Sequence, residues 1–111
     1  MIEAQITGNK GVELTERAKE ILGILEEKHI LSIIEYVDAH SPCMRTDVYR
    51  EISRTATMSK KLDELKGLGL IDYRHLNAPS IDLIVITDKG RKVAGMVRSM
   101  SDILNNWELY A

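Results

Sequence analysis

A chain of 111 residues with 44% hydrophobic and 29% charged residues is typical of one globular domain with its own hydrophobic core. Its single cysteine, Cys43, excludes an internal disulfide and suits a reducing compartment. No segment approaches the roughly 20 apolar residues of a membrane span, and the N-terminal residues lack the basic and apolar pattern of an export signal. We therefore expect a cytoplasmic protein that has no membrane partner.

The net charge of −2 does not by itself indicate a nucleic-acid-binding protein, but the charge is unevenly distributed. Residues 1–40 contain four basic and eight acidic side chains, whereas residues 41–75 contain seven basic and five acidic ones. Residues 76–111 contain four of each. The central third is therefore the net basic part of the chain, and a contact with nucleic acid is expected there.

Residues 1–13 are expected to form an N-terminal arm, and a helix is predicted over about 14–27. Thr15 is a suitable N-cap for it, because its side-chain oxygen can accept a hydrogen bond from a free backbone N–H of the first turn. The helix has an apolar stripe at helical spacing, formed by Leu14, Ala18, Ile21, Leu22 and Leu25. A second helix, from about 29 to 39, is apolar nearly all round, which predicts that it lies at the buried centre of the domain.

After Pro42, a very short strand over 43–45 is followed by a third helix, for which Thr46 is the expected cap. Residues 53–55 form a turn, and the next helix covers about 55–66. Met58, Leu62 and Leu65 form its apolar stripe, whereas its opposite side is polar. Two short helices joined by a tight turn, the second with an outward polar face, are typical of a helix-turn-helix unit.

The period of the pattern changes from helical to two at Leu70, which predicts a strand that begins at Ile71. A turn over 77–80 and a second β-rich run from Ile81 to Thr87 complete a hairpin. A hairpin directly after a helix-turn-helix is a wing, so residues 71–87 are the predicted wing. A last helix over about 88–108 has an apolar seam at spacings of four and three residues, the kind that packs one helix against another.

The two terminal stripes lie outside what a small winged domain needs for its own core. We therefore expect the helices at about 14–27 and 88–108 to form the interface of a homodimer. The expected interface residues are Leu14, Ala18, Ile21, Leu25, Val93, Val97, Met100, Leu104 and Trp107.

Over about residues 20–107 the chain resembles MarR/HxlR-type winged helix-turn-helix transcriptional regulators. The similar segments are 21–34, which resembles the helix that enters the core, 57–71, which resembles the recognition helix running into the wing, and 78–91, which resembles the second wing strand and its exit. Lys28-His29 stands where typical HxlR members have Gly-Lys-Trp, so the resemblance is to the superfamily more than to that subfamily. It implies a mainly α (α+β) domain at 14–111, with a three-helix core, a β-hairpin wing and terminal dimerisation helices.

The resemblance also implies a homodimer that binds double-stranded DNA, sometimes under the control of a small-molecule effector. On the recognition helix, Thr55, Thr57, Ser59 and Lys60 are then expected to meet base edges in the major groove, and Arg54 and Lys61 to meet phosphates. Asp63 and Glu64 are expected to face away from the groove or to flank it. In the wing, the candidate contacts are Arg74, His75 and Asn77.

Other functions have weaker support in the sequence. The histidines and Cys43 match no metal-ligand spacing, and no catalytic set or Gly-rich phosphate loop is present, so we expect neither an enzyme nor a cofactor. Cys43 could be a redox sensor, although an unreactive half-buried thiol is the more common role for a lone cysteine. The remaining alternative is a winged helix that docks proteins or acts as an architectural chromatin protein, because fold alone does not determine function.

Overall fold

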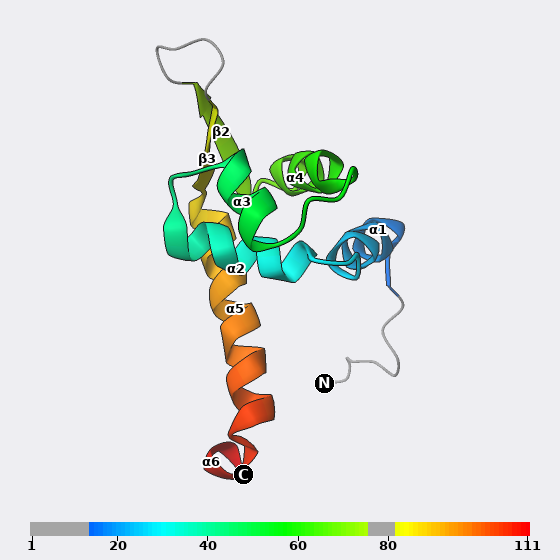
Figure 1. Cartoon of the computed structure of the whole chain (residues 1–111). Coiled ribbons are helices and arrows are strands. Elements are labelled where there is room, and N and C mark those ends of the chain that lie inside the picture. Colours follow the sequence, from blue (N-terminus) through cyan, green and yellow to red (C-terminus); the bar gives the residue numbers. More distant parts are fainter. Residues whose placement is uncertain (1–13, 76–81) are drawn as a thin grey trace.

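The computed structural model describes residues 14–75 and 82–111 (Figure 1). The predicted arm at 1–13 and the predicted turn at 77–80 lie outside the described residues. The elements are α1 (Glu16–Leu25), α2 (Ile30–His40), β1 (Cys43–Met44), α3 (Arg45–Glu51), α4 (Met58–Gly67), β2 (Ile71–His75), β3 (Asp82–Ile86), α5 (Asp88–Asn105) and α6 (Trp107–Tyr110). Their order confirms the winged helix-turn-helix prediction.

Helix α2 lies at the centre of the core, as its apolar sequence predicts. Its Ile30, Ile33, Ile34 and Val37 side chains have no exposed surface. The helix contacts α1, α3, α5 and β3, so it is surrounded by both helices and sheet. Full burial of a Val or Ile side chain contributes about 1.5–3 kcal/mol, so α2 makes a large contribution to the hydrophobic stabilisation of the domain.

The sheet has the strand order β1-β3-β2, with antiparallel neighbours. Ile84 of β3 lies opposite Cys43 of β1 on one side and Tyr73 of β2 on the other. Ile71, Ile84 and Cys43 are buried, which fits the alternation of inward and outward side chains in a strand. The predicted hairpin therefore joins the core through its root, and β1 adds a short third strand to it.

Thr15 caps α1 and α5 begins at Asp88, as predicted, whereas two helices begin at other residues than those predicted. Helix α3 begins at Arg45, one residue before the expected cap Thr46, because Asp47 Oδ2 accepts a hydrogen bond from the Met44 N–H at 2.9 Å. Helix α4 begins at Met58 and not at about 55, with Thr57 as its N-cap residue. Helix α1 is shorter than predicted, and the predicted last helix is interrupted at Asn106, where α5 ends and α6 follows.

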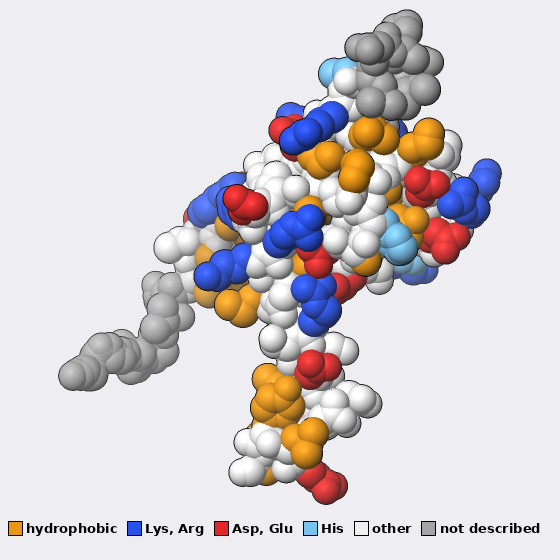
Figure 2. Space-filling model, turned by 90° about the vertical axis from the view of Figure 1, so that its left-hand side faces the viewer, with side chains coloured by type: hydrophobic (Ala, Val, Ile, Leu, Met, Phe, Trp, Pro, Cys, Tyr) orange, Lys and Arg blue, Asp and Glu red, His pale blue; other side chains and the backbone are white. Residues whose placement is uncertain are grey.

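Helix α5 extends away from the rest of the domain, which gives the molecule principal dimensions of 56 × 35 × 25 Å (Figure 1). Only its first part packs closely on the domain, with Ala94 buried and Val93 packed against the core. Figure 2 shows hydrophobic side chains gathered towards the far end of this helix. The protruding part of α5 together with α6 is hereafter called the stalk, residues 96–110.

Candidate nucleic-acid interface

One side of α4 is fixed in the core and its other side is open to solvent. Met58, Leu62 and Leu65 are 0–1% exposed, as the apolar stripe predicts. Ser59 and Lys60 are exposed in the first turn of the same helix. The helix is therefore held rigidly from behind while its N-terminal polar side chains remain accessible to a ligand.

Lys61 does not belong to this open face, so the prediction that it points outward is wrong. Its side chain is only 8% exposed, and Nζ donates a hydrogen bond of 2.7 Å to the backbone carbonyl of Lys28. The cause is the helical period, which places residue 61 beside Met58 and Leu65 rather than beside Lys60. Lys61 therefore links α4 to the connection between α1 and α2. Its ammonium group is not available to contact a phosphate.

The segment before α4 places three further candidate residues at the same end of the helix. Arg54, Thr55 and Thr57 are all exposed. The Thr55 and Thr57 hydroxyl oxygens lie 3.2 Å apart and share a hydrogen bond. The structure therefore brings these three residues together with Ser59 and Lys60, although Thr55 and Thr57 precede the helix and are not on its outward face.

The wing is joined to α4 by a polar contact at its root. The Tyr73 hydroxyl of β2 donates a hydrogen bond of 2.7 Å to Asp63 Oδ1 of α4. Burial of the ring, together with the hydrogen bond to Asp63, raises the pKa of Tyr73 to about 12, so the hydroxyl keeps its proton near neutral pH. Asp63 is exposed in the second turn of α4, and its hydrogen bond with Tyr73 links the wing root to the helix.

Arg45 of α3 is a part of this surface that the sequence did not reveal. Its guanidinium carbon lies 4.6 Å from the centroid of the Tyr73 ring, and its Nη1 lies 3.5 Å from Ser59 Oγ. These contacts join residues far apart in the sequence, from three different elements. Only the folded arrangement brings them together, and no local spacing signals it.

The described arginines divide into those that form an ion pair with a carboxylate and those that do not. The paired ones, each in an ion pair with a carboxylate, are Arg17, Arg50, Arg91 and Arg98. Among the described residues, no carboxylate forms an ion pair with Arg45, Arg54 or Arg74. All three lie in α3, before α4 or in β2, so the uncompensated guanidinium groups are on the helix-turn-helix and wing.

The wing candidates are only partly described. Arg74 and His75 are exposed near the end of β2, on the strand that leads away from α4. Asn77 lies outside the described residues. The structure therefore places two of the three predicted wing contacts on an accessible strand. They lie at the end of β2 that is farther from α4 along the chain.

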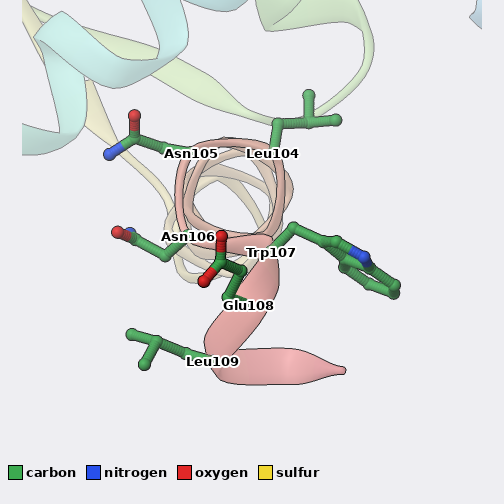
Figure 3. A pocket seen from close by; sticks show the side chains of 6 residues that line it. All are labelled: Leu104, Asn105, Asn106, Trp107, Glu108 and Leu109. Atoms are coloured by element: carbon green, nitrogen blue, oxygen red, sulfur yellow. The ribbon is translucent and has the colours of Figure 1, made fainter.

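The nine predicted dimer residues differ in exposure. Leu14, before α1, is 51% exposed, and Ala18 and Val97 are partly buried. Ile21, Leu25 and Val93 pack against the core of their own chain, which removes much of their surface from any interface. Met100, Leu104 and Trp107 are 53%, 84% and 60% exposed. Leu104 and Trp107 point to the same side of the chain where α5 gives way to α6 (Figure 3). The stalk also exposes Met96, Leu109 and Tyr110, which the prediction omitted.

Cys43 and the histidines are the side chains that the sequence offers for a redox centre or a metal site. Cys43 is buried, and burial raises the pKa of its thiol to about 11, so the reactive thiolate is scarce near neutral pH. No cluster of three or more metal-ligating side chains is found among the described residues. In the described part of the chain, no helix has the length and hydropathy needed to cross a membrane.

No protein-family model matches the sequence, and no curated protein matches it significantly. Solved structures do match its fold. MepR, a transcription regulator of the Staphylococcus aureus multidrug efflux pump MepA, is 21% identical with a TM-score of 0.67, over 86% of this chain and 73% of that one.

A S. aureus MepR–DNA complex matches with 20% identity and a TM-score of 0.67, over 83% of this chain and 77% of that one. An archaeal protein described as a structural homologue of MarR-like transcriptional regulators, and previously reported as a mechanosensitive channel, is 17% identical with a TM-score of 0.62, over 76% of this chain and 73% of that one. These likenesses agree with the order of helices and strands described above. The chain therefore has the winged helix-turn-helix fold of the MarR-like regulators.

Proposed function

We propose that this protein is a homodimeric transcriptional regulator that binds double-stranded DNA sequence-specifically, with α4 in the major groove and the wing beside it. The observation that most directly supports this is the accessible first turn of α4, with Ser59 and Lys60, on a helix whose other side is fixed in the core. The likeness to MepR in its complex with DNA gives independent support. Binding alone accounts for the proposed role, which needs no catalytic group and no cofactor.

The proposed roles of the side chains follow from their chemistry. Thr57, Ser59 and Lys60 have donors that suit base edges, and Thr55 adds a hydroxyl beside them. Arg54 is the proposed phosphate contact before α4, and Arg74 and His75 are the proposed contacts of the wing. Because Lys61 is buried, few cations remain on this face, which predicts a modest affinity whose salt slope is shallow, since that slope grows with the number of phosphates neutralised.

The proposed homodimer rests on the stalk. Leu104 and Leu109 are both 84% exposed, and an exposed apolar surface of this kind is typical of an interface with another chain. A second copy is the proposed partner because a dimer also doubles the few cations that face DNA.

The test is the salt dependence of DNA binding, measured by fluorescence anisotropy with a labelled duplex. The wild type should bind at low salt. Lys60→Ala should weaken binding and reduce the slope of log affinity against log salt by about one, because one cation is lost from the face that meets the duplex. Lys19→Ala is the matched control, since Lys19 is exposed on α1 and paired with Glu16.

If the wild type shows no duplex binding at low salt, the proposal is wrong and the protein-docking alternative takes its place. If the wild type binds all duplexes equally, the protein is an architectural DNA-binding protein and not a sequence-specific regulator. Equal salt slopes for Lys60→Ala and Lys19→Ala would mean that α4 is not the contact surface.

A further inference from the structure

We propose that Arg45 is a phosphate-binding residue whose position is set by the ring of Tyr73, so that α3 and the wing root supply positive charge to the DNA-binding face. The inference deepens the proposed function and rests on it. It assigns to the helix-turn-helix a contact that neither the apolar stripe nor the polar face of α4 predicts.

The first support is the chain of contacts that holds the guanidinium. The Tyr73 hydroxyl is bound to Asp63 of α4 at 2.7 Å, and the ring is half-buried, so its orientation is fixed from two sides. The guanidinium carbon of Arg45 lies 4.6 Å from the ring centroid, within the range of a cation–π contact. A long, flexible side chain is thereby held in one place, which lowers the entropy lost when it binds a ligand.

The second support is the state of the guanidinium itself. Among the described residues no carboxylate forms an ion pair with Arg45, whereas Arg50 of the same helix contacts Asp47 at 3.0 Å and Glu51 at 3.3 Å. The guanidinium is partly buried, and the polar side chains beside it, Ser59, Tyr49 and Tyr73, carry neutral hydroxyl groups. Arg45 can therefore bind an anion without breaking an existing ion pair, and Arg50 cannot.

The third support is location. Arg45 Nη1 lies 3.5 Å from Ser59 Oγ, at the exposed first turn of α4 and next to Lys60 in the sequence. Asp63, whose charge opposes phosphate, is engaged by Tyr73 directly beside it. Arg45 therefore extends the cationic surface from the N-terminus of α4 towards the wing. A phosphate group is the ligand that suits this place, because a bidentate guanidinium contact matches its geometry.

The first experiment compares Arg45→Gln with Arg50→Gln by anisotropy across a salt series, with a set of duplexes of different sequence. Arg45→Gln should reduce the salt slope by about one and weaken all duplexes by a similar factor, because phosphate contacts position the protein without reading sequence. Arg50→Gln should leave the slope and the affinities as in the wild type. A purely structural role for Arg45 would change stability without changing the slope.

The second experiment uses the unaltered protein, so it does not depend on the folding of a variant. An arginine-specific dicarbonyl reagent is applied with and without a saturating duplex, and modification of each arginine is followed by mass spectrometry. Duplex should protect Arg45 and leave the modification of Arg50 unchanged. Equal modification of Arg45 in both samples would overturn the proposal.

The two proposals fail in different ways. If the wild type binds no duplex, the proposed function is wrong and the role of Arg45 is wrong with it. If the wild type binds and Arg45→Gln has the wild-type slope, only the role of Arg45 is overturned.

Discussion

Lys60 and Lys61 are neighbours in the sequence, yet they have opposite environments in the fold. Lys60 is exposed in the first turn of α4, whereas Lys61 is buried with its ammonium group bound to the Lys28 carbonyl. Burial of a charged group is costly unless it is hydrogen-bonded, so the Lys28 carbonyl is what makes this position acceptable for lysine. Because that partner is 33 residues away, the sequence around α4 could not separate the two lysines.

Cys43 is a second residue whose environment decides its chemistry. Its thiol is buried in the core against the sheet, and burial raises its pKa from 9.0 to about 11. An oxidant sensor needs an accessible, low-pKa thiol, and Cys43 has neither property. The structure therefore favours the unreactive thiol over the sensor.

We predict that iodoacetamide modifies Cys43 much more slowly in the folded protein than in the chain unfolded by urea at the same pH. The raised pKa also sets a pH dependence: the unfolded thiol ionises first, so stability is lost as the pH rises from 9.0 towards 11. Mass spectrometry of the alkylated protein measures the first effect. Equal alkylation rates in the two states would mean that the Cys43 thiol is accessible and reactive in the folded protein, as an oxidant sensor requires.

At the scale of elements, the junction where α4, β2 and α5 meet sets the direction of both the wing and the stalk. Gly69, with φ of +79°, ends α4 in a left-handed turn in which Leu70 N–H donates to the Leu65 carbonyl at 3.0 Å. The Thr87 hydroxyl donates to the Gly69 carbonyl at 2.6 Å and accepts from Gly90 N–H at 2.9 Å. One threonine thus joins the end of α4 to the start of α5.

Gly90 allows α5 to approach this junction, because a Cβ there would lie 2.0 Å from the Leu70 carbonyl oxygen. Gly90→Ala should therefore lower the free energy of unfolding by about 1–3 kcal/mol or more, as overpacking against backbone does. Gly95→Ala is the control in the same helix, since nothing lies within 4 Å of its Cβ position. It should raise stability by about 0.4–1 kcal/mol. Urea unfolding measures both, and equal values would contradict the close approach.

The elements themselves were largely predictable, whereas their tertiary contacts were not. The apolar periods of α2 and α4 and the alternation of the wing strands depend on local sequence, and all were confirmed. The first residue of α3 was not, because Asp47 binds the Met44 N–H in place of a cap by Thr46. Arg45 was missed because its contacts, Ser59 and Tyr73, lie in other elements.

At the scale of the whole molecule, ion pairs between α2 and α5 add to the packing of Val93 and Ala94 that holds the base of the stalk on the domain. Arg98 Nη1 lies 2.9 Å from Glu35 Oε2 and 2.7 Å from Asp38 Oδ2, and Arg91 contacts Asp38 at 3.2 Å. The Asp38 side chain is only 9% exposed, so these contacts are less screened than ordinary surface pairs. The stalk therefore leaves the domain in a defined direction, as a dimer of fixed geometry would require.

For the proposed dimer we predict that Leu104→Glu yields a monomer by light scattering at tens of micromolar, while the wild type is a dimer. Leu104 is 84% exposed, so the variant should keep the wild-type unfolding free energy per chain apart from the loss of association. Ser32→Glu, at an exposed position of α2 outside the predicted interface, is the control because it adds the same single negative charge. A wild type that is monomeric at this concentration would contradict the dimer.

Selection of bound sites from a pool of random duplexes tests the central claim most directly, because it examines DNA binding, sequence preference and dimer geometry together. We predict enrichment of an inverted repeat whose half-site centres lie about 10 base pairs apart or a multiple of that distance, as two recognition helices on one face of the duplex require. Recovery of no enriched sequence would contradict the account of this protein as a sequence-specific regulator.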